Sequence, residues 1–430
     1  MKIALVNPNW SFAGSIYFGC REPHLPLEYG YAAALLQQRG HRAEIFDAHA
    51  EDLDEAALAA RLAGFAPQMI VVTTAPSYLF WRCPPAELRV PQQTLTALAG
   101  LPGLRVAVGP HGSTTPGAVF QKLGVDAVVL GECEEVLVRL AGAPRAAWGG
   151  IAGLCHAEGG EIVVQGGPQA ADMARLPALV WPRPALRRHR HHHHRFDMEP
   201  QGPGAEIEAS RGCPYHCTFC AKDNFRDRYR RRPLDTVLAE LDGLIAAGVG
   251  YVYFIDEIFL PWRELLEELV RRPIRFGVQT RIDLWNRDML DLLGAAGCVS
   301  IEAGVESLSA AGRDRLAKRC KLPTATLTAL LIHAKRSVPF VQANLIATGE
   351  DDPETVQEWR AKLRHRGVWA NDPVPLFPYP GSPEYTRRWG APDDRAWERA
   401  VEHYLGQYAG FSEIQEARPR PLAELEMPSR

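Results

Sequence analysis

The sequence of 430 residues has no marked excess of charge of either sign. Its 48 Lys and Arg residues against 51 Asp and Glu residues give a formal net charge of −3, so we expect no partnership with nucleic acid or an anionic membrane. No apolar run approaches the roughly 18 residues of a membrane-spanning helix. The N-terminus lacks the apolar segment and cleavage site of a secretory signal. These absences predict a cytoplasmic protein.

A disulfide framework is also missing. The nine cysteines are odd in number and scattered along a long chain. In a reducing compartment such thiols more often bind metal or stay reduced. The composition, 46% hydrophobic and 23% charged, is close to the globular average, and the length suits two or three domains.

Short apolar segments alternate with amphipathic helical patterns along most of the chain. Over residues 1–141 this alternation predicts an α/β domain with a doubly wound, Rossmann-like sheet that binds ligands beyond the carboxyl ends of its strands. Residues 142–204 are interpreted as a connecting segment with a His- and Arg-rich linker. A second alternation over 205–388 predicts a partial (β/α)6 barrel, and 389–430 a short helical tail.

Three cysteines follow the first predicted strand of the barrel in a C-x3-C-x2-C pattern: Cys213, Cys217 and Cys220. Three thiolates on one short loop can bind three irons of a [4Fe–4S] cluster and leave the fourth iron open to an outside ligand. Zinc usually requires a fourth protein ligand, and His216 inside the loop could not easily supply it. The alternative is three structural thiols.

With Phe219 before its last cysteine, this motif closely resembles the signature of the radical S-adenosylmethionine (radical SAM) superfamily. The resemblance implies a partial barrel, a catalytic cluster on the three cysteines, and S-adenosylmethionine (SAM) at the open iron as the source of a 5′-deoxyadenosyl radical. A Pro-Gly-Ser-Pro stretch within Pro378–Pro383 resembles a further loop of one subgroup.

The resemblance also assigns SAM and cluster contacts to residues near the cysteines and at the ends of later strands. These are Phe219, Asp256, Glu257, Gln279, Arg281 and Glu306. Asp256 stands within a stretch where the family more commonly has Gly-Gly-Glu. Ordinary alternatives are a solvated strand end for the acidic pair and a surface salt bridge from Arg281 to Asp283 or Glu306.

The first domain lacks Gly-x-Gly-x-x-Gly after its first strand, which argues against a dinucleotide site. Its segments Pro26–Ala33, Gly109–Thr114 and Gly131–Glu134 resemble the cobalamin-binding domain that precedes the barrel in one radical SAM subgroup. The resemblance implies cobalamin contacts from small and hydroxyl-bearing residues at the strand ends: Thr73, Thr74, Ser77, Tyr78, Gly109, His111, Thr114, Gly131 and Glu132. A scaffold without cofactor is the alternative.

Together these resemblances predict a cobalamin-dependent radical SAM enzyme, most simply a C-methyltransferase acting on an unactivated carbon of a small molecule. Its cofactors would be a [4Fe–4S] cluster, SAM and cobalamin, with flavodoxin or ferredoxin as electron donor. The alternatives are a non-methylating enzyme (rearrangement or oxidative cyclisation) and a cofactor-binding protein with an inert cluster. The substrate is not identified.

Two charged runs remain. His189 and His191–His194 could bind a divalent metal, although such tracts are compositional signals only. A run of five arginines is interpreted as a solvated or salt-bridged face or, alternatively, as a site for a carboxylate or phosphate: Arg226, Arg228, Arg230, Arg231 and Arg232.

Overall fold

The structure is a computed structural model in which residues 1–17, 22–81, 83–189, 202–407 and 419–426 are described. The chain forms two compact units. The first comprises Met1–Leu179, Cys220–Asp227 and Phe377–Arg430, and the second comprises Val180–Phe219 and Arg228–Leu376. A short segment that begins at the third motif cysteine therefore belongs to the unit of the N-terminal sheet.

The first unit is built on a seven-stranded sheet of order β2-β1-β3-β4-β5-β6-β7. β1 to β5 are parallel, whereas β6 and β7 are antiparallel. Gly159 and Gly160, both with positive φ, form the two-residue turn between β6 and β7. The strands are β1 (Lys2–Asn7), β2 (Arg42–Asp47), β3 (Met69–Thr73), β4 (Leu104–Val108), β5 (Ala127–Val129), β6 (Leu154–Glu158) and β7 (Glu161–Gln165).

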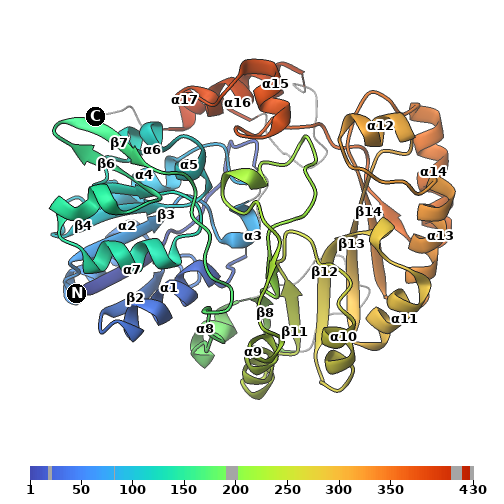
Figure 1. The fold of residues 1–430 in the computed structure, drawn as a ribbon, viewed down its shortest axis with the longest axis horizontal. Helices are drawn as coiled ribbons and strands as arrows, with labels where there is room; N and C mark the ends of the chain where they lie inside the picture. Colours follow the sequence, from blue (N-terminus) through green and yellow to red (C-terminus); the bar gives the residue numbers. More distant parts are fainter. Residues whose placement is uncertain (18–21, 82, 190–201, 408–418, 427–430) are drawn as a thin grey trace. The chain divides into compact units, whose positions relative to one another are not determined.

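Helices cover both faces of this sheet (Figure 1). α1 packs against α7, while α2 packs against α4 and α4 against α6. The fully buried β3 fits this sandwich, because a strand covered on both faces is apolar throughout. The helices are α1 (Leu27–Gln38), α2 (Glu55–Phe65), α3 (Tyr78–Trp81), α4 (Arg89–Ala97), α5 (Pro110–Thr114), α6 (Pro116–Leu123), α7 (Glu134–Gly142), α15 (Pro383–Trp389), α16 (Ala396–Gln407) and α17 (Leu422–Leu425), with the 3₁₀ turns η1 (Arg145–Gly150) and η2 (Lys222–Asn224).

The second unit contains a six-stranded parallel sheet of order β15-β14-β13-β12-β11-β8, with a two-stranded ribbon of β9 and β10. Consecutive strands of the six are neighbours, as expected of strand–helix repeats that wind in one direction. The strands are β8 (Gly204–Ile207), β9 (Ser210–Arg211), β10 (Arg230–Arg231), β11 (Tyr251–Phe254), β12 (Arg275–Arg281), β13 (Cys298–Glu306), β14 (Phe340–Leu345) and β15 (Trp369–Ala370).

The helices of the second unit follow its strands, and α11, α13 and α14 lie along the outer side of the sheet (Figure 1). Side-chain caps define where two of them begin: Asn286 accepts from the amide of Met289, and Asp352 from that of Thr355. The helices are α8 (Arg183–Arg188), α9 (Leu234–Ala246), α10 (Arg263–Val270), α11 (Arg287–Ala295), α12 (Ala310–Arg315), α13 (Thr324–Ala334) and α14 (Pro353–His365), with the 3₁₀ turn η3 (Ile282–Leu284).

The predicted fold class is confirmed: a Rossmann-like sheet, then a partial barrel of six strands, then C-terminal helices. The first sheet is mixed rather than purely parallel, because part of the segment interpreted as a connection forms β6 and β7. Residues 389–407, predicted as a separate tail, belong to the first unit.

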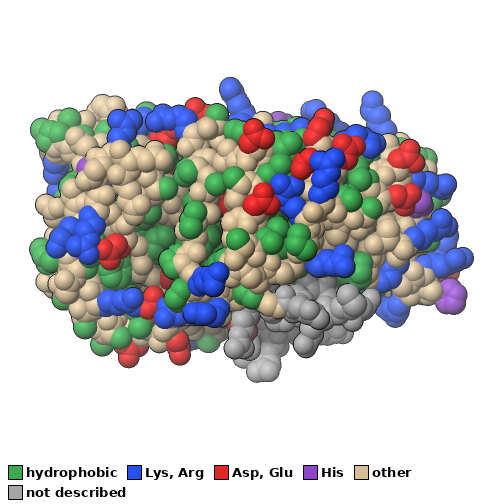
Figure 2. All heavy atoms as spheres, turned by 90° about the horizontal axis from the view of Figure 1, so that it is seen from below, with side chains coloured by type: hydrophobic (Ala, Val, Ile, Leu, Met, Phe, Trp, Pro, Cys, Tyr) green, Lys and Arg blue, Asp and Glu red, His purple; other side chains and the backbone are tan. Residues whose placement is uncertain are grey.

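Charges of both signs are interspersed on the surface. Figure 2 shows one face on which Lys and Arg side chains lie among Asp, Glu and hydrophobic ones, as expected for a net charge of −3. Among the described residues, no helix is both long enough and apolar enough to cross a membrane.

A buried ion pair fastens the start of the second unit's sheet. Arg232 Nη2 lies 2.8 Å from Glu240 Oε2 on α9, with both side chains at most 1% exposed. Arg232 Nη1 also donates to the carbonyl of Glu208, which follows β8, at 2.8 Å. Arg232 therefore ties α9 to the end of β8.

We predict that Glu240→Ala lowers the free energy of unfolding of the second unit by about 3–5 kcal/mol, because it leaves the Arg232 guanidinium buried without its carboxylate. Urea unfolding followed by circular dichroism measures the loss. The double variant Arg232→Met/Glu240→Leu, which removes both charges, should recover much of it. Equal losses in the single and double variants would contradict this account.

Candidate active site

The three motif cysteines lie on the chain between β9 and η2, and each is half-buried. Gly212 leads into the loop with a φ of +78°, and a Cβ there would lie 2.0 Å from the carbonyl oxygen of Arg228. Only glycine fits this close approach between the residues that flank the β9–β10 ribbon. Within the loop, the amide of Thr218 donates to the carbonyl of Leu316 at 2.9 Å. The loop is thus held by backbone contacts.

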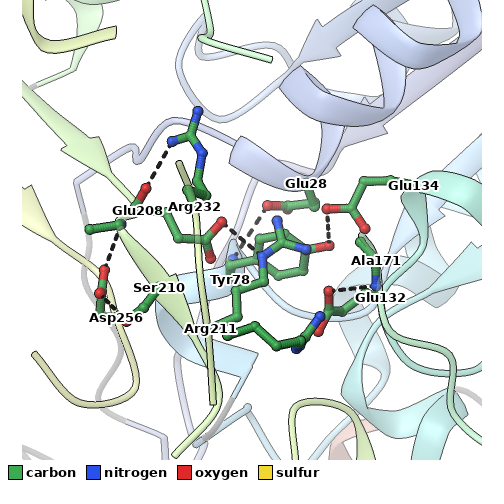
Figure 3. Close-up of polar contacts among 12 residues, drawn as sticks. Glu28, Tyr78, Glu132, Glu134, Ala171, Glu208, Ser210, Arg211, Arg232 and Asp256 are labelled. Carbon is green, nitrogen blue, oxygen red and sulfur yellow. Dashed lines mark hydrogen bonds and ion pairs between the residues drawn. The ribbon is translucent and has the colours of Figure 1, made fainter. Parts of the chain in front are cut away.

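Asp256 and Glu257, at the end of β11, bind the chain that leads to the first cysteine (Figure 3 shows Asp256). Asp256 accepts from the amide of Ala209 at 2.9 Å and from the hydroxyl of Ser210. Glu257 accepts from the amide of Gly212 at 2.7 Å. Burial raises the pKa of Asp256 to about 7. The possibility of a solvated strand end is therefore wrong for Asp256, which is 2% exposed.

A second ion pair lies directly before the loop. Arg211 Nε lies 2.8 Å from Glu208 Oε2, and both side chains are fully buried (Figure 3). A conformation that separated the two side chains would leave a buried charge without its partner. The pair therefore favours one local conformation over the alternatives.

At the end of β12, Arg281 forms two hydrogen bonds with Asp283, at 2.7 and 3.1 Å, and its guanidinium lies 4.0 Å from the centre of the Tyr215 ring. The predicted pairing with Asp283 is present, but it is buried, with side chains 8% and 7% exposed, rather than at the surface. In the described residues, two buried atoms at this strand end have no hydrogen-bond partner: Arg281 Nη1 and Gln279 Oε1. Both could bind a polar ligand.

Glu306 ends β13 in an unusual backbone conformation. Its φ is +67°, next to an irregularity in the pairing of β13 with β14. Its carboxylate lies 3.0 Å from Lys318 Nζ. Burial raises the pKa of the Cys217 thiol, whereas Lys318 and Arg281 lower it. Two cations thus favour a thiolate at Cys217 against the effect of burial. Phe219 is half-buried beside the last cysteine.

The strand ends of the first unit carry the residues predicted to contact cobalamin. Most of their side chains bind other protein groups: Thr73 Oγ1 donates to the carbonyl of Ala75, Thr114 Oγ1 to that of Pro110, and Glu132 accepts from the amide of Ala171. Ser77 differs, since within the described chain its buried hydroxyl has no partner. Among the predicted contacts in the described part of this edge, Ser77 therefore carries a buried side-chain atom without a partner, which a ligand could bind.

Gly109, Gly131 and His111 are required by packing at these strand ends. A Cβ on Gly109 would lie 2.2 Å from Thr74 Oγ1, and one on Gly131 2.3 Å from the carbonyl oxygen of Gln169. The His111 ring is fully buried, with Nδ1 3.1 Å from Thr74 Oγ1 and Nε2 2.7 Å from the carbonyl oxygen of Pro85. Burial lowers the His111 pKa to about 3, so the ring is neutral.

Two buried glutamates near these strand ends are not among the predicted site residues. Glu28, in the first turn of α1, accepts from the amide of Tyr78 at 3.3 Å, and Glu134, in the first turn of α7, accepts from the Tyr78 hydroxyl at 2.8 Å (Figure 3). Burial raises the pKa of Glu28 to about 8. For Glu28, the signal in the sequence is a glutamate within an otherwise apolar helix start.

The histidine run is described only at its first residue. His189 is buried, and its Nδ1 lies 2.7 Å from the carbonyl oxygen of Ala185. His191–His194 lie outside the described residues. The arginine run divides: Arg226 and Arg232 are buried, whereas Arg228 is exposed. A solvated face is therefore wrong for these two, whereas a salt bridge, the other form of that interpretation, is present at Arg232, which pairs with Glu240.

Residues 207–358 match the family model of the radical SAM superfamily, and this span contains the cysteine loop and the strand ends around it. The chain is a radical SAM enzyme. The enzyme is 23% identical to an uncharacterized methyltransferase of Pyrococcus horikoshii, over 94% of this chain and 84% of that protein. It is 26% identical to the anaerobic magnesium-protoporphyrin IX monomethyl ester cyclase of Cereibacter sphaeroides, over 88% of this chain but only 63% of that protein.

Solved structures share the fold of this radical SAM enzyme over both units. The radical SAM methyltransferase TsrM from Kitasatospora setae, with tryptophan substrate and a SAM analogue bound, has a TM-score of 0.68 at 20% identity and covers 90% of this chain and 76% of its own. TsrM has also been solved with cobalamin and a [4Fe–4S] cluster. The cobalamin-dependent enzyme OxsB, with aqua-cobalamin and SAM bound, has a TM-score of 0.65 at 16% identity and covers 99% of this chain and 57% of its own.

The cysteine loop of this radical SAM enzyme suits a cluster better than a single ion. Among the described residues, no three His, Cys, Asp or Glu side chains surround a point that could hold one metal ion. Thiolates that each bind a different iron need not converge on one point. The three half-buried thiols, with Lys318 and Arg281 near Cys217, are a donor set that fits such a cluster.

We predict that Glu28→Gln makes the free energy of unfolding of the radical SAM enzyme less dependent on pH. Because burial raises the Glu28 pKa from 4.5 to about 8, the folded state retains a proton that the unfolded state loses. The stability from this group is therefore fully present below pH 4.5 and is lost as the pH rises toward 8. Glutamine stays neutral, so the variant should gain stability relative to wild type as the pH increases.

Urea unfolding of both proteins at about pH 5 and about pH 8.5 tests this, since the two conditions fall on either side of most of the titration. Other groups that titrate, His111 included, are common to both proteins, so their effect cancels in the difference between the two free energies of unfolding. A stability difference that stays constant between the two conditions would contradict a raised Glu28 pKa.

Proposed function

We propose that the enzyme binds a [4Fe–4S] cluster through Cys213, Cys217 and Cys220, with SAM beside it, and cobalamin at the strand ends of its first unit. The observation that carries the proposal is the set of half-buried motif thiols, within the span of the family match, beside a strand end with unpartnered polar atoms. Such a cluster would supply the electron that cleaves SAM to a radical, and cobalamin would supply a carrier for a methyl group.

The protein's own residues would orient SAM through Arg281 and Gln279. Arg281 Nη1 is a buried donor without a partner in the described structure, and the Asp283 pair and the Tyr215 ring fix the plane of the guanidinium. A guanidinium held in this way can donate to a carboxylate in a defined direction. Gln279 Oε1 can accept from an ammonium or hydroxyl group.

At the first unit, Ser77 would donate to or accept from an amide of the corrin periphery. Its hydroxyl is buried and has no partner in the described chain. The bound structures of TsrM and OxsB, which share the fold over most of this chain, support cobalamin as the ligand. Thr73, Thr74, Gly109, His111, Thr114, Gly131 and Glu132 would act mainly by shaping the turns.

We propose C-methylation of a small molecule as the reaction. The methyltransferase of Pyrococcus horikoshii and TsrM support it, and the tryptophan bound to TsrM is a small-molecule substrate. The magnesium-protoporphyrin ester cyclase, at comparable identity, supports a second candidate, oxidative cyclisation without methyl transfer. A cytoplasmic location and reduction by flavodoxin or ferredoxin belong to the proposal.

We predict that Cys213→Ala, Cys217→Ala and Cys220→Ala each abolish the electron paramagnetic resonance signal of the reduced cluster, because each removes the protein ligand of one iron. Iron and sulfide content after anaerobic reconstitution should fall with the signal. Cys155→Ala, which alters a cysteine in the core of the first unit, is the matched control and should keep it. A cluster signal that survives all three motif variants would refute the assignment.

We predict that methylation yields S-adenosylhomocysteine and 5′-deoxyadenosine in about equal amounts, since one SAM donates the methyl group and another provides the radical. Reduced, cobalamin-loaded enzyme is incubated with the small-molecule fraction of its host and labelled SAM, and both products are quantified. Deoxyadenosine without S-adenosylhomocysteine would favour the cyclase-type reaction. Absence of both, in wild type and in Cys217→Ser alike, would leave a cofactor-binding protein.

A further inference from the structure

The segment Cys220–Asp227 belongs to the compact first unit, although the chain on either side of it belongs to the second. It contains only one turn of 3₁₀ helix, η2. So short a segment cannot form a core of its own, and its conformation depends on the groups that bind it.

One contact closes the segment on itself. Lys222 is 1% exposed, and its Nζ donates to the Asp227 carboxylate at 2.6 Å and to the Asp227 carbonyl at 3.0 Å. The amide of Arg226 donates to the carbonyl of Lys222 at 2.7 Å. These bonds form a compact loop with Arg226 near its end.

A second contact joins the segment to the loop that precedes α15. Asn224 Nδ2 donates to the carbonyl of Pro380 at 3.0 Å. The next residue, Gly381, has a φ of +88°, and a Cβ there would lie 2.0 Å from Asn224 Nδ2. The Pro-Gly-Ser-Pro stretch noted in the sequence thus provides the space in which Asn224 docks.

The third contact is the buried side chain of Arg226. Its exposed fraction is 0%, and its guanidinium carbon lies 3.9 Å from the centre of the Tyr78 ring. The ring of Phe225 also packs edge-on against Trp81 with centroids 6.1 Å apart. Arg226 and Phe225 therefore pack against α3 of the first unit.

Two buried glutamates bind the tyrosine on which Arg226 stacks. Glu28 and Glu134 bind the backbone amide and the hydroxyl of Tyr78, and the charge of Arg226 lowers the pKa of Glu28 against the larger effect of burial. A buried guanidinium is stable only where carboxylates and aromatic faces replace its water. The Arg226 side chain consequently has few alternative positions. Because residues 220–225 precede it directly in the chain, their backbone conformation is restricted as well.

We propose that Arg226 is a positioning residue that, stacked on the Tyr78 ring, fixes the segment Cys220–Asp227 and with it the third cluster cysteine. The inference rests on the proposed function, because it gives Cys220 the role of a cluster ligand. It adds a role that neither the cysteine motif nor the arginine run suggests, since Arg226 lies six residues beyond the motif.

The first test uses the full-length protein without cofactors. Hydrogen–deuterium exchange of the peptide that covers residues 220–227 is compared in wild type, Arg226→Gln and the matched control Arg228→Gln, whose side chain is exposed. We expect exchange to be about tenfold faster in Arg226→Gln, because this variant loses a desolvated cation–π contact. We expect the exchange rate to be unchanged in Arg228→Gln. Unchanged exchange in a folded Arg226→Gln protein would overturn the proposal.

Tyr78 provides a second pair of variants should Arg226→Gln not fold. Tyr78→Phe keeps the ring under the guanidinium and should leave exchange in the segment near the wild-type rate. Tyr78→Leu removes the ring and should increase exchange as Arg226→Gln does. Equal exchange in the two Tyr78 variants would overturn the stacking role.

The second test follows the reconstituted cluster. Arg226→Gln should shift the principal g values and the midpoint potential of the reduced cluster, and Arg226→Lys, which restores the charge without the planar stack, should recover them in part. Faster exchange with an unchanged cluster spectrum would overturn the positioning of Cys220. A wild-type protein that binds no iron would refute the proposed function instead. The exchange experiment would still test whether Arg226 fixes the segment Cys220–Asp227.

Discussion

An irregular loop keeps one conformation only where its backbone groups are bound, and the loop of the three cysteines meets this requirement mainly through carboxylates. Asp256 and Glu257 receive the amides of Ala209 and Gly212, so the chain that enters the loop is bound to the end of β11. β11 is paired on both sides, with β8 and with β12. The position of the first cysteine therefore follows from the register of the parallel sheet.

The chain is held by buried charge on both sides of the loop. Before the loop, Glu208 and Arg211 form a fully buried pair. After the loop, Lys222 is paired with Asp227, and Arg226 is buried over the Tyr78 ring. Such groups add little net stability, because desolvation offsets most of the attraction. Their effect is on specificity, since any other conformation would leave a buried charge without its counterion. This would suit a loop that binds the cluster proposed above.

The sequence was sufficient to predict what depends on local pattern. Alternating strands and helices predicted both sheets, and the cysteine motif indicated the radical SAM superfamily, which residues 207–358 match. The Arg281–Asp283 pair, two residues apart, was one of the considered alternatives. Contacts that join distant parts of the chain were not predicted: Glu28 and Glu134 meet at Tyr78, 50 and 56 residues away along the chain.

Burial separates residues that look identical in the sequence. Arg226, Arg228 and Arg232 belong to one basic run, yet only Arg228 is exposed. The hydroxyl and carboxyl residues of the first unit show the same difference, because Thr73, Thr114 and Glu132 bind their own turns whereas Ser77 does not. Composition indicates which groups could bind a ligand, but the partners they already have determine which of them remain available.

An available buried group is informative because it is unfavourable. Leaving a buried donor or acceptor without a partner costs about 1–3 kcal/mol, so such groups are uncommon unless something else binds them. Among the predicted contacts in the described chain, Ser77, Gln279 and Arg281 each carry such an atom. They lie just beyond β3 and at the end of β12, the edges where parallel α/β sheets bind their ligands. The same atoms that lower the stability of the free protein are therefore the ones that a bound cofactor would satisfy.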